Sequence, residues 1–600
     1  INGWTNVVTK LNPDRACLTA SIMLGFQDVP IDKAFFYTAT SSRWGVISNG
    51  KLEPVYYTIK AVGDLRAHPT RIGLKSINMP DGARALAGID ENGDVDILLA
   101  TYKSGKREIN FDFSAMGQFA RGEIYIYDEN NKLERVACVD NPNGKMQVNT
   151  LCNSVVALLK LYKNAPQTNE EKVKITATGK TAGTIKQLNC GNHGPALKSY
   201  SIHFKTKYFG NMKIPYIRLN NEVRENSGLK LINTNQIFPL KDADPTKKEF
   251  YDFRATDDYI AQIINYGGAK PFYCLSNTDE RLINRMHFRI DKPQVDKWCT
   301  VCENIVRHYN EGKWDGFRHN IEYWEIWAEP DNPHFWSASF EDYIDLYIRA
   351  SKHLKSCFPK IKVGGPSLHA YSQEKAAAFI TACKAAGAPI DFFSYMEYKY
   401  EKGEYNNIIH RADGLRKLLD DNGFKNTEII VSAWHPAADR ENPWPTNNVD
   451  WTTLYSSIML HWQDSPIDKA MFDAVSNNGW GVYNTPNPNS RYYMFIAMAD
   501  LMEHPIRLEL KTEGLSETSA VVAGKNEKGD TDVVISLHGV TTRSTVFDFS
   551  TLGKFSNADI YLMDRTRPEL TKVSSYANPD GKVEISNNRP DALILVKLKK

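Results

Sequence analysis

The chain has 600 residues, of which 42% are hydrophobic, 24% charged and 11% aromatic, which is typical of a globular protein with several domains. A formal net charge of +2 gives no reason to expect nucleic acid or an anionic membrane as a partner, and no apolar run approaches the ~20 residues that cross a bilayer. Nine scattered cysteines favour reduced thiols, and hence the cytoplasm, over a disulfide framework. Because the chain begins with Ile1 rather than methionine, secretion remains open.

The first 65 residues contain helix-like runs around a short apolar stretch, IDKAFFYTA (31–39), and most of this pattern returns near the end of the chain. The matching pairs, each 436 residues apart, are SIMLGFQDVPIDKAFF (21–36) with SIMLHWQDSPIDKAMF (457–472), HPTRI (68–72) with HPIRL (504–508), and FDFSAMGQF (111–119) with FDFSTLGKF (547–555). We interpret residues 20–161 as copy one, and residues 456–598 as copy two, of a single repeated unit.

Each copy has two parts. Residues 1–65 are predicted to be the last strand and the helices of a barrel, and residues 66–164 alternate between turn signals as in a β-sandwich. Residues 501–600 are predicted to form the same sandwich again. Copy one therefore has a barrel tail without a barrel, and we hypothesise a partner polypeptide, or a second copy, that carries the missing first barrel.

Between the copies, residues 165–180 are predicted to be a linker and first strand, and residues 181–500 alternate strand and helix. The candidate strands are 185–191, 214–220, 270–276, 321–327, 361–366, 390–395, 428–434 and, from copy two, 469–475. Eight such units predict an α/β fold, a (β/α)₈ TIM barrel followed by a β-sandwich, with the N-terminal second copy of the barrel tail and sandwich added.

Active sites of such barrels lie at the carboxyl ends of the strands. Amide, imidazole, carboxylate and aromatic groups gather there, and this combination suits a sugar, because hydroxyls need dense hydrogen bonding and ring faces stack on aromatics. The predicted glycan-binding residues are His193, Arg218, Asn220, Asn221, Trp327, Trp336, Tyr395, Trp434, His435 and Trp480. Glu329, beside Trp327, is the candidate general acid. The alternative is that the tryptophans simply cap the barrel.

A C-x-x-C at Cys299 and Cys302 has no second pair and lies in a helical pattern, which favours helix packing over a metal or redox role. The sequence predicts neither a metal nor a cofactor.

WEIWAEPDNPHFW (324–336), with NHGP (192–195) near strand one and IRLNN (217–221) on strand two, resembles glycoside hydrolase family 39 over residues 181–600. That family contains β-xylosidases and α-L-iduronidases, and it belongs to the clan of retaining (β/α)₈ glycosidases. The resemblance implies hydrolysis of a glycosidic bond in a plant or microbial glycan. It also makes Glu329 similar to the family's acid/base at the end of strand four.

Three positions depart from the family pattern. Ala328 stands where the family has asparagine, Met396 where histidine is expected, and Ala433 where the nucleophilic glutamate is expected. Several hypotheses follow: a hydrolase disarmed naturally or by substitution, a working hydrolase in which Glu397 replaces the nucleophile, a catalytically inactive glycan-binding or structural module, and a protein-interaction scaffold. The sequence does not identify the sugar.

Overall fold

The computed structural model describes residues 13–36, 46–48, 51–105, 108–128, 132–150, 152–164, 172–194, 208–220, 231–240, 242–277, 292–399, 405–437, 449–475, 481–482, 488–539, 544–565, 567–586 and 591–600. The chain divides into two compact units. One combines Ile1–Thr184 with His504–Lys600, and the other is Ile185–Glu503. Among the described residues, no helix has the length and apolar character that crossing a membrane would require.

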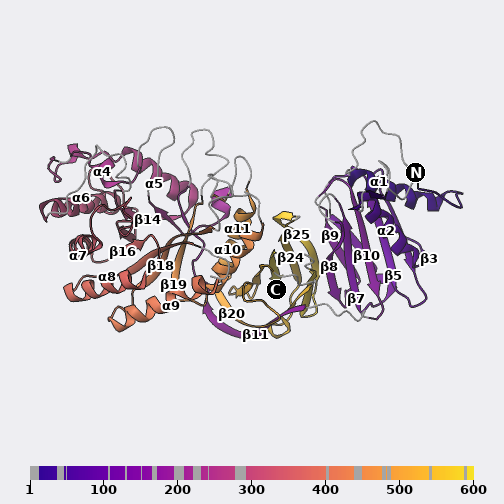
Figure 1. The fold of residues 1–600 in the computed structure, drawn as a ribbon. Coiled ribbons are helices and arrows are strands. Elements are labelled where there is room, and N and C mark those ends of the chain that lie inside the picture. The colour runs from indigo at the N-terminus through magenta and orange to yellow at the C-terminus, as the bar shows by residue number, and fades with distance from the viewer. Residues whose placement is uncertain are drawn as a thin grey trace. The chain divides into compact units, whose positions relative to one another are not determined.

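The unit Ile185–Glu503 is a closed barrel of eight parallel strands with helices around it (Figure 1). The strands are β12 (Cys190–Asn192), β13 (Tyr216–Leu219), β14 (Lys270–Leu275), β15 (Tyr323–Ile326), β16 (Lys362–Leu368), β17 (Phe392–Lys399), β18 (Glu428–Ala437) and β19 (Ile467–Asp473). The barrel prediction is confirmed, and the eighth strand comes from copy two, as the repeat indicated. Strand β19 closes the barrel by pairing with β12 and β18.

The described helices of the barrel unit are α4 (Thr234–Ile237), α5 (Arg254–Gly267), α6 (Lys292–Asn310), α7 (Phe340–Cys357), α8 (Gln373–Ala386), α9 (Tyr405–Asp421), α10 (Val449–His461) and α11 (Ser490–Met502), with the 3₁₀ turn η3 (Lys248–Phe250). Sequence signals fix several helix ends. For example, a capping box starts α7, in which the Ser339 side chain accepts a hydrogen bond from the Asp342 N–H, and Asp342 accepts one from the Ser339 N–H. Gly387 ends α8 in the left-handed conformation that glycine favours.

Inside the barrel, one buried cluster gathers an apolar or aromatic side chain from seven of the strands: Cys190, Tyr216, Phe272, Tyr323, Phe392, Ile430 and Met471. This layer packs the barrel interior, so the polar groups that could act on a ligand lie elsewhere along the strands.

One 15-stranded sheet runs through the other unit, and its C-terminal part has the strand order β25-β24-β27-β22-β21-β20-β11-β23-β26, after which β26 pairs with β8 (Lys132–Asp140). Its strands are β20 (Ile506–Glu513), β21 (Ala520–Lys525), β22 (Thr531–Leu537), β23 (Ser544–Asp548), β24 (Asn557–Asp564), β25 (Arg567–Ala577), β26 (Lys582–Ser586) and β27 (Ala592–Lys599), with the 3₁₀ turn η4 (Ser550–Leu552). One strand of this sheet, β11, precedes the barrel in the chain. Strand β11 (Lys172–Thr184), which overlaps the predicted linker and first strand at 165–180, pairs with β20 and β23 and is not a barrel strand.

The N-terminal part contains an antiparallel sheet in the order β8-β7-β10-β5-β4-β3. The elements are α1 (Pro13–Gly25), η1 (Phe26–Asp28), β1 (Ile47–Ser48), β2 (Lys51–Leu52), α2 (Pro54–Arg66), β3 (Thr70–Ile72), β4 (Arg84–Ile89), β5 (Val95–Thr101), β6 (Glu108–Asp112), η2 (Ser114–Met116), β7 (Arg121–Tyr127), β8 (Lys132–Asp140), β9 (Lys145–Asn149) and β10 (Val155–Tyr162). Side chains alternate across β5: Leu98 and Ala100 pack under α1 and α2, while Ile97 and Leu99 face the core on the other side. The helices of the predicted barrel tail therefore cover this sheet.

The two copies share element boundaries at the sequence offset of 436. Helix α1 corresponds to α10 and α2 to α11, residue for residue at both ends. They differ at the segment between the helices. The counterpart of β19 in copy one forms no strand over residues 31–36, and residues 37–39 of the predicted strand lie outside the described residues.

Candidate active site

Glu329 lies just beyond the end of β15, in a tight bend of the backbone. Trp327 has a φ of 67° and Glu329 a φ of 53°, both in the left-handed region that bulky residues rarely adopt. His193 after β12 and Ser367 in β16 also have positive φ values, of 56° and 54°. Such backbone conformations cost free energy and concentrate at functional sites, which draws attention to this end of the barrel.

Three contacts hold Glu329 in place. Its N–H donates to the Ser367 carbonyl at 2.9 Å, and its Oε2 accepts from Asn332 Nδ2 at 2.8 Å and lies 2.7 Å from His369 Nδ1. The residue is 9% exposed. Both side-chain contacts are made by Oε2, so Oε1 is the oxygen that is better placed to contact a ligand. The predicted acid is thus a nearly buried carboxyl group in a fixed orientation.

A buried ionic network lies within the barrel, and its members come from five strands. Arg218 donates from Nε to Glu325 Oε2 at 2.7 Å and from Nη2 to Ser367 Oγ at 3.0 Å. Glu325 also accepts from Ser394 Oγ at 2.7 Å, and Ser367 Oγ is 3.0 Å from Ser432 Oγ. Burial opposes the charge on Arg218, but Glu325 more than offsets this and raises the pKa of the guanidinium. Among the described residues, Nη1 of Arg218 has no hydrogen-bond partner.

The three positions that depart from the family pattern are all buried. Ala328 and Ala433 are 0% exposed, and Met396 is 2% exposed. Met396 and Ala433 are paired neighbours on β17 and β18. Ala433 directly follows Ser432, a member of the buried network.

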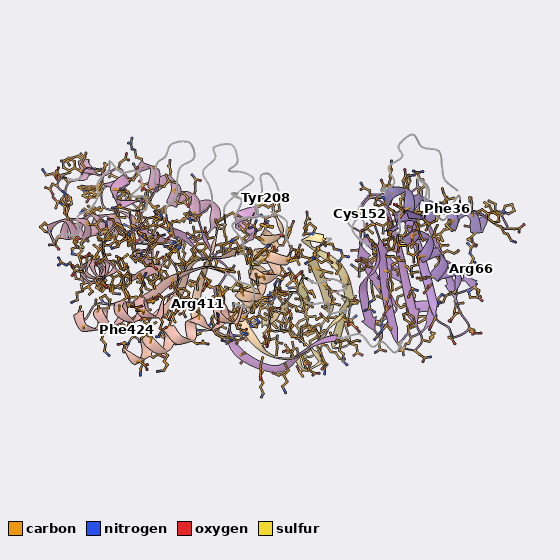
Figure 2. The ribbon with its side chains drawn as sticks, viewed as in Figure 1. Phe36, Arg66, Cys152, Tyr208, Arg411 and Phe424 are labelled. Carbon is orange, nitrogen blue, oxygen red and sulfur yellow. The ribbon has the colours of Figure 1, made fainter. Side chains whose placement is uncertain are left out.

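Glu397 faces the helix layer. Its Oε2 lies 2.8 Å from Nε of Arg411 on α9, the helix that follows its strand; Arg411 is labelled in Figure 2. Tyr395, two residues earlier, packs its ring edge-on against Tyr371 with centroids 5.3 Å apart. Ser394 instead donates to Glu325 inside the barrel. Phe392 and Ser394 face the barrel interior, so the alternation of β17 points Tyr395, a predicted glycan-binding residue, toward the helix layer.

The predicted aromatic platforms are packed against other protein side chains. Trp327 packs edge-on with Trp336 and donates from Nε1 to the Phe335 carbonyl, and it is 4% exposed. Trp434 is 0% exposed and packs against Trp462 at 5.0 Å. His435 contacts Arg491 of α11 at 3.2 Å, and burial together with that charge lowers its pKa well below the usual range. The faces of these rings are therefore largely covered by protein and leave little surface on which a sugar could stack.

Asp473, at the end of β19, is a candidate site residue that the predicted set omits. Its Oδ2 accepts a hydrogen bond from the Tyr398 hydroxyl at 2.7 Å, and its Oδ1 lies 3.6 Å from His193 Nε2. Burial and the charges of Asp473 and Glu329 raise the pKa of Tyr398 well above its usual value. The hydroxyl of Tyr398 therefore stays protonated and lies within electrostatic reach of both carboxylates. The position of Asp473 at a strand end was the available sequence signal.

The predicted residue Asn220 carries a buried amide, and so does Asn192, which the predicted set omits. Asn192 and Asn220 end β12 and follow β13, they are 1% and 5% exposed, and among the described residues the Oδ1 atom of each lacks a hydrogen-bond partner. Buried polar atoms of this kind cost free energy unless a ligand or water satisfies them. Asn221 and Trp480 lie outside the described residues.

Sequence comparisons place this barrel near known glycosidases. Residues 201–482 match the family model "Glycosyl hydrolases family 39". The chain is 24% identical to a beta-xylosidase of Geobacillus stearothermophilus over 239 residues, which is 34% of this chain and 45% of that protein. It is 23% identical to a beta-xylosidase of Caldicellulosiruptor saccharolyticus over 337 residues, or 48% of this chain and 64% of that protein. The matches thus span less than two thirds of either relative.

Solved structures share the fold. A glucosidase from Croceicoccus marinus aligns with a TM-score of 0.58 at 20% identity, covering 72% of this chain and 99% of that one. A GH39 beta-xylosidase from Caulobacter crescentus aligns with a TM-score of 0.55 at 14% identity, covering 71% and 99%. At these identities the likeness establishes a barrel followed by a β-sandwich or half-barrel, and nothing finer.

Proposed function

Because the barrel of this chain belongs to glycosyl hydrolase family 39, we propose that it binds a xyloside-like glycan at the carboxyl ends of its strands, with Glu329 as the proton donor. The observation that carries this proposal is the orientation of Glu329, whose Oε2 is held by Asn332 and His369. The names of the two beta-xylosidase relatives support the choice of sugar.

The buried polar groups around Glu329 support a ligand rich in hydroxyls. Asn192 and Asn220 present buried amide oxygens, and Arg218 a buried Nη1, that lack partners among the described residues. Asp473, paired with Tyr398, adds an acceptor for a hydroxyl group. A sugar could satisfy such groups at once, and its binding would then recover the free energy that their burial costs.

Turnover by the chain should be slow, because a retaining mechanism needs a second carboxyl group about 5–5.5 Å from the first. Ala433 occupies the position where the family resemblance implies that nucleophile, and its methyl group can neither attack an anomeric carbon nor stabilise positive charge. General acid catalysis alone supplies only about 10²–10⁴-fold. We therefore propose that the unmodified chain binds its glycan but hydrolyses it only slowly.

The direct test is to restore the carboxylate. Ala433→Glu should raise hydrolysis of an aryl β-xyloside by roughly 10²-fold or more, since removal of one catalytic group commonly costs that much. Ala433→Gln is the matched control, because it adds the same volume without the charge and should stay inactive. Adding Glu329→Gln to Ala433→Glu should abolish most of the gain with a poor leaving group. If the glutamate and glutamine variants behave alike, Ala433 is not the nucleophile position.

The second candidate is a hydrolase in which Glu397 supplies the missing carboxylate. The ion pair between Glu397 and Arg411 of α9 disfavours this role, because it would have to break before Glu397 could act on a sugar. Glu397→Gln separates the two cases. It should leave the activity of the Ala433→Glu variant intact, whereas loss of all turnover by the unmodified chain would favour Glu397 as the catalytic group.

A third candidate is a glycan-binding module without turnover. Calorimetric titration with xylo-oligosaccharides tests it, because binding that persists in Glu329→Gln without any detectable hydrolysis by Ala433→Glu would favour a pure binding role. Binding lost in Asp473→Asn would place the glycan at the end of β19.

Copy one supports a further proposal about partners. Exposed large apolar side chains concentrate between residues 29 and 79, and among them Phe35 is 82% and Ile31 44% exposed. Their counterparts in copy two, Met471 and Ile467, are 0% exposed because β19 lies in the barrel wall. We propose that residues 29–36 dock against a second barrel of this kind that lacks its own eighth strand.

Hydrogen exchange at residues 31–36 tests the docking proposal. In this chain alone these amides should exchange rapidly, while those of β19 are protected. Mixing with a barrel fragment of residues 185–461, whose folding is checked by circular dichroism, should slow exchange at 31–36 and not elsewhere in copy one. Protection before mixing, or no change with a folded fragment, would contradict the proposal.

A further inference from the structure

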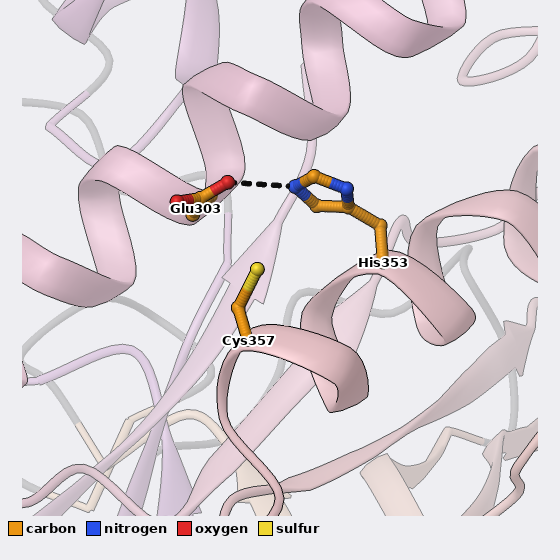
Figure 3. Close-up of side chains that lie close together, drawn as sticks. All are labelled: Glu303, His353 and Cys357. Carbon is orange, nitrogen blue, oxygen red and sulfur yellow. Dashed lines mark hydrogen bonds and ion pairs between the residues drawn. The ribbon is translucent and has the colours of Figure 1, made fainter.

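A mixed cluster of side chains lies between two helices of the barrel unit. Glu303 projects from α6, and His353 and Cys357 project from consecutive turns of α7 (Figure 3). Their spacing of four residues puts the imidazole and the thiol on one face of α7. His353 Nε2 is 2.8 Å from Glu303 Oε2, and one donor atom from each of the three residues lies within 4.8 Å of the others.

We propose that Glu303, His353 and Cys357 bind a divalent transition-metal ion of the zinc class. Thiolate, imidazole and carboxylate are the three protein ligands that zinc accepts, with bond lengths of about 2.0–2.3 Å. Those bond lengths put tetrahedral ligand atoms about 3.3–3.8 Å apart. Small side-chain rotations reach that spacing from the observed one, and the fourth position would be left to water.

Burial singles out Cys357 among the cysteines. Of the eight free cysteines recorded in the described part of the chain, seven are buried and only Cys357 is half-buried. Burial raises the pKa of Cys299 to about 12, so that thiol behaves as an apolar side chain. Glu303 and His353 are also half-buried. An ion could therefore reach all three groups from solvent.

The charges around the cluster allow a cation. Arg307 adds a positive charge at 2.8 Å from Glu303, and Glu311 balances it at 2.6 Å from the same guanidinium. The charge of Arg307 beside the cluster is therefore offset by Glu311.

The simpler interpretation is that Glu303 and His353 form an ion pair between the two helices and that Cys357 has no role in it. The two readings differ in the role of the thiol. A metal site requires sulfur coordination, whereas an ion pair is indifferent to Cys357. The experiment therefore needs a readout that reports the thiolate itself.

Cobalt(II) is the probe, because a cobalt–thiolate bond gives a charge-transfer band in the near ultraviolet that other ligands do not give. The full chain, stripped of metal with a chelator, is titrated with cobalt(II) under reducing conditions, and zinc is then added in competition. We expect one equivalent of cobalt to produce the thiolate band and zinc to remove it. Absence of binding, or binding without the band, would overturn the proposal.

Variants assign the ligands. Cys357→Ser should abolish the band, and His353→Ala and Glu303→Gln should each weaken binding at least about tenfold, the loss seen even for outer-sphere partners of metal ligands. Cys299→Ser on α6 and His410→Ala on α9 are matched controls that should leave the titration unchanged. Circular dichroism melts verify that each variant is folded. A band that survives Cys357→Ser, or vanishes in Cys299→Ser, would assign the metal to another thiol and overturn the proposed site.

Discussion

Copy one and copy two share the matched sequence segments but fold in two different settings. Both form their two helices and their antiparallel strands at matching positions. Copy two forms the strand β19 between its helices, whereas the described residues 31–36 of copy one form none. Met471 is fully buried in β19, while its counterpart Phe35 is 82% exposed. The helices and sheets are therefore encoded locally, while the barrel strand depends on neighbours with which to pair. A β-strand is stable only when partners satisfy its backbone and cover its side chains.

The largest difference in stability between the two copies is expected when a lysine is introduced at Met471 and at its counterpart Phe35. Met471→Lys places an unpaired ammonium in the barrel wall and should destabilise the barrel unit by about 3–5 kcal/mol. Phe35→Lys, at an exposed position, should change stability by no more than about 0.5 kcal/mol. Tryptophan fluorescence during urea unfolding measures the Met471→Lys loss, since the tryptophans of the described residues belong to the barrel unit. Hydrogen exchange in β5 measures the effect of Phe35→Lys, because Phe35 belongs to the other compact unit. Equal losses would mean that residues 29–36 are packed in solution.

The stability of the N-terminal sheet in copy one should depend on pH. Burial, partly offset by Lys160 and His68, raises the pKa of Asp96 to about 6. The folded state then holds a proton that the unfolded chain has already lost between about pH 4 and pH 6. Stability of the N-terminal sheet should therefore fall as pH rises through this window, by up to about 3 kcal/mol. Hydrogen exchange in β5 measures it, and Asp96→Asn should flatten the dependence.

The smallest effect compares two glycines that should respond alike. A Cβ at Gly88 would lie 2.2 Å from the His68 carbonyl oxygen, and one at Gly524 would lie 2.1 Å from that of His504. Each contact is with backbone, so alanine at either position should cost about 1–3 kcal/mol through forced displacement. Thermal melts of the two single variants provide the measurement. A tolerated Gly88→Ala beside a costly Gly524→Ala would show that the sheet of copy one is looser than that of copy two.

Much of the fold could be predicted from the sequence because its signals are local. Alternating apolar runs and the repeat located all eight barrel strands. Strand β11 overlaps the first strand predicted at 165–180, but its place in the C-terminal sheet was not predicted, since its partners β20 and β23 follow the barrel in the chain. Its sequence, KVKITATGKTAGT, does alternate over its first half.

The candidate site was predicted less well than the fold. Glu329 could be proposed from its motif, but the inward or outward direction of Tyr395 and Glu397 depends on contacts with Arg411 and Tyr371 that no local pattern shows. Asp473 stands out through the hydrogen bond that the Tyr398 hydroxyl donates to it, a contact between β17 and β19 that no local pattern shows. The Glu303–His353–Cys357 cluster joins two helices across 50 residues. Only the four-residue spacing on α7 could have hinted at it.

The pairing of β11 with β20 has a consequence for how the protein is made. Thr184 lies opposite Ile506, so the chain leaves the C-terminal sheet from one strand and returns to it in the adjacent one, with the whole barrel as the connection. During synthesis, β11 emerges from the ribosome long before β20 or β23 exists. Its apolar residues must wait unpaired while the barrel is translated, so the nascent chain should be most prone to aggregation, and most dependent on chaperones, during that interval.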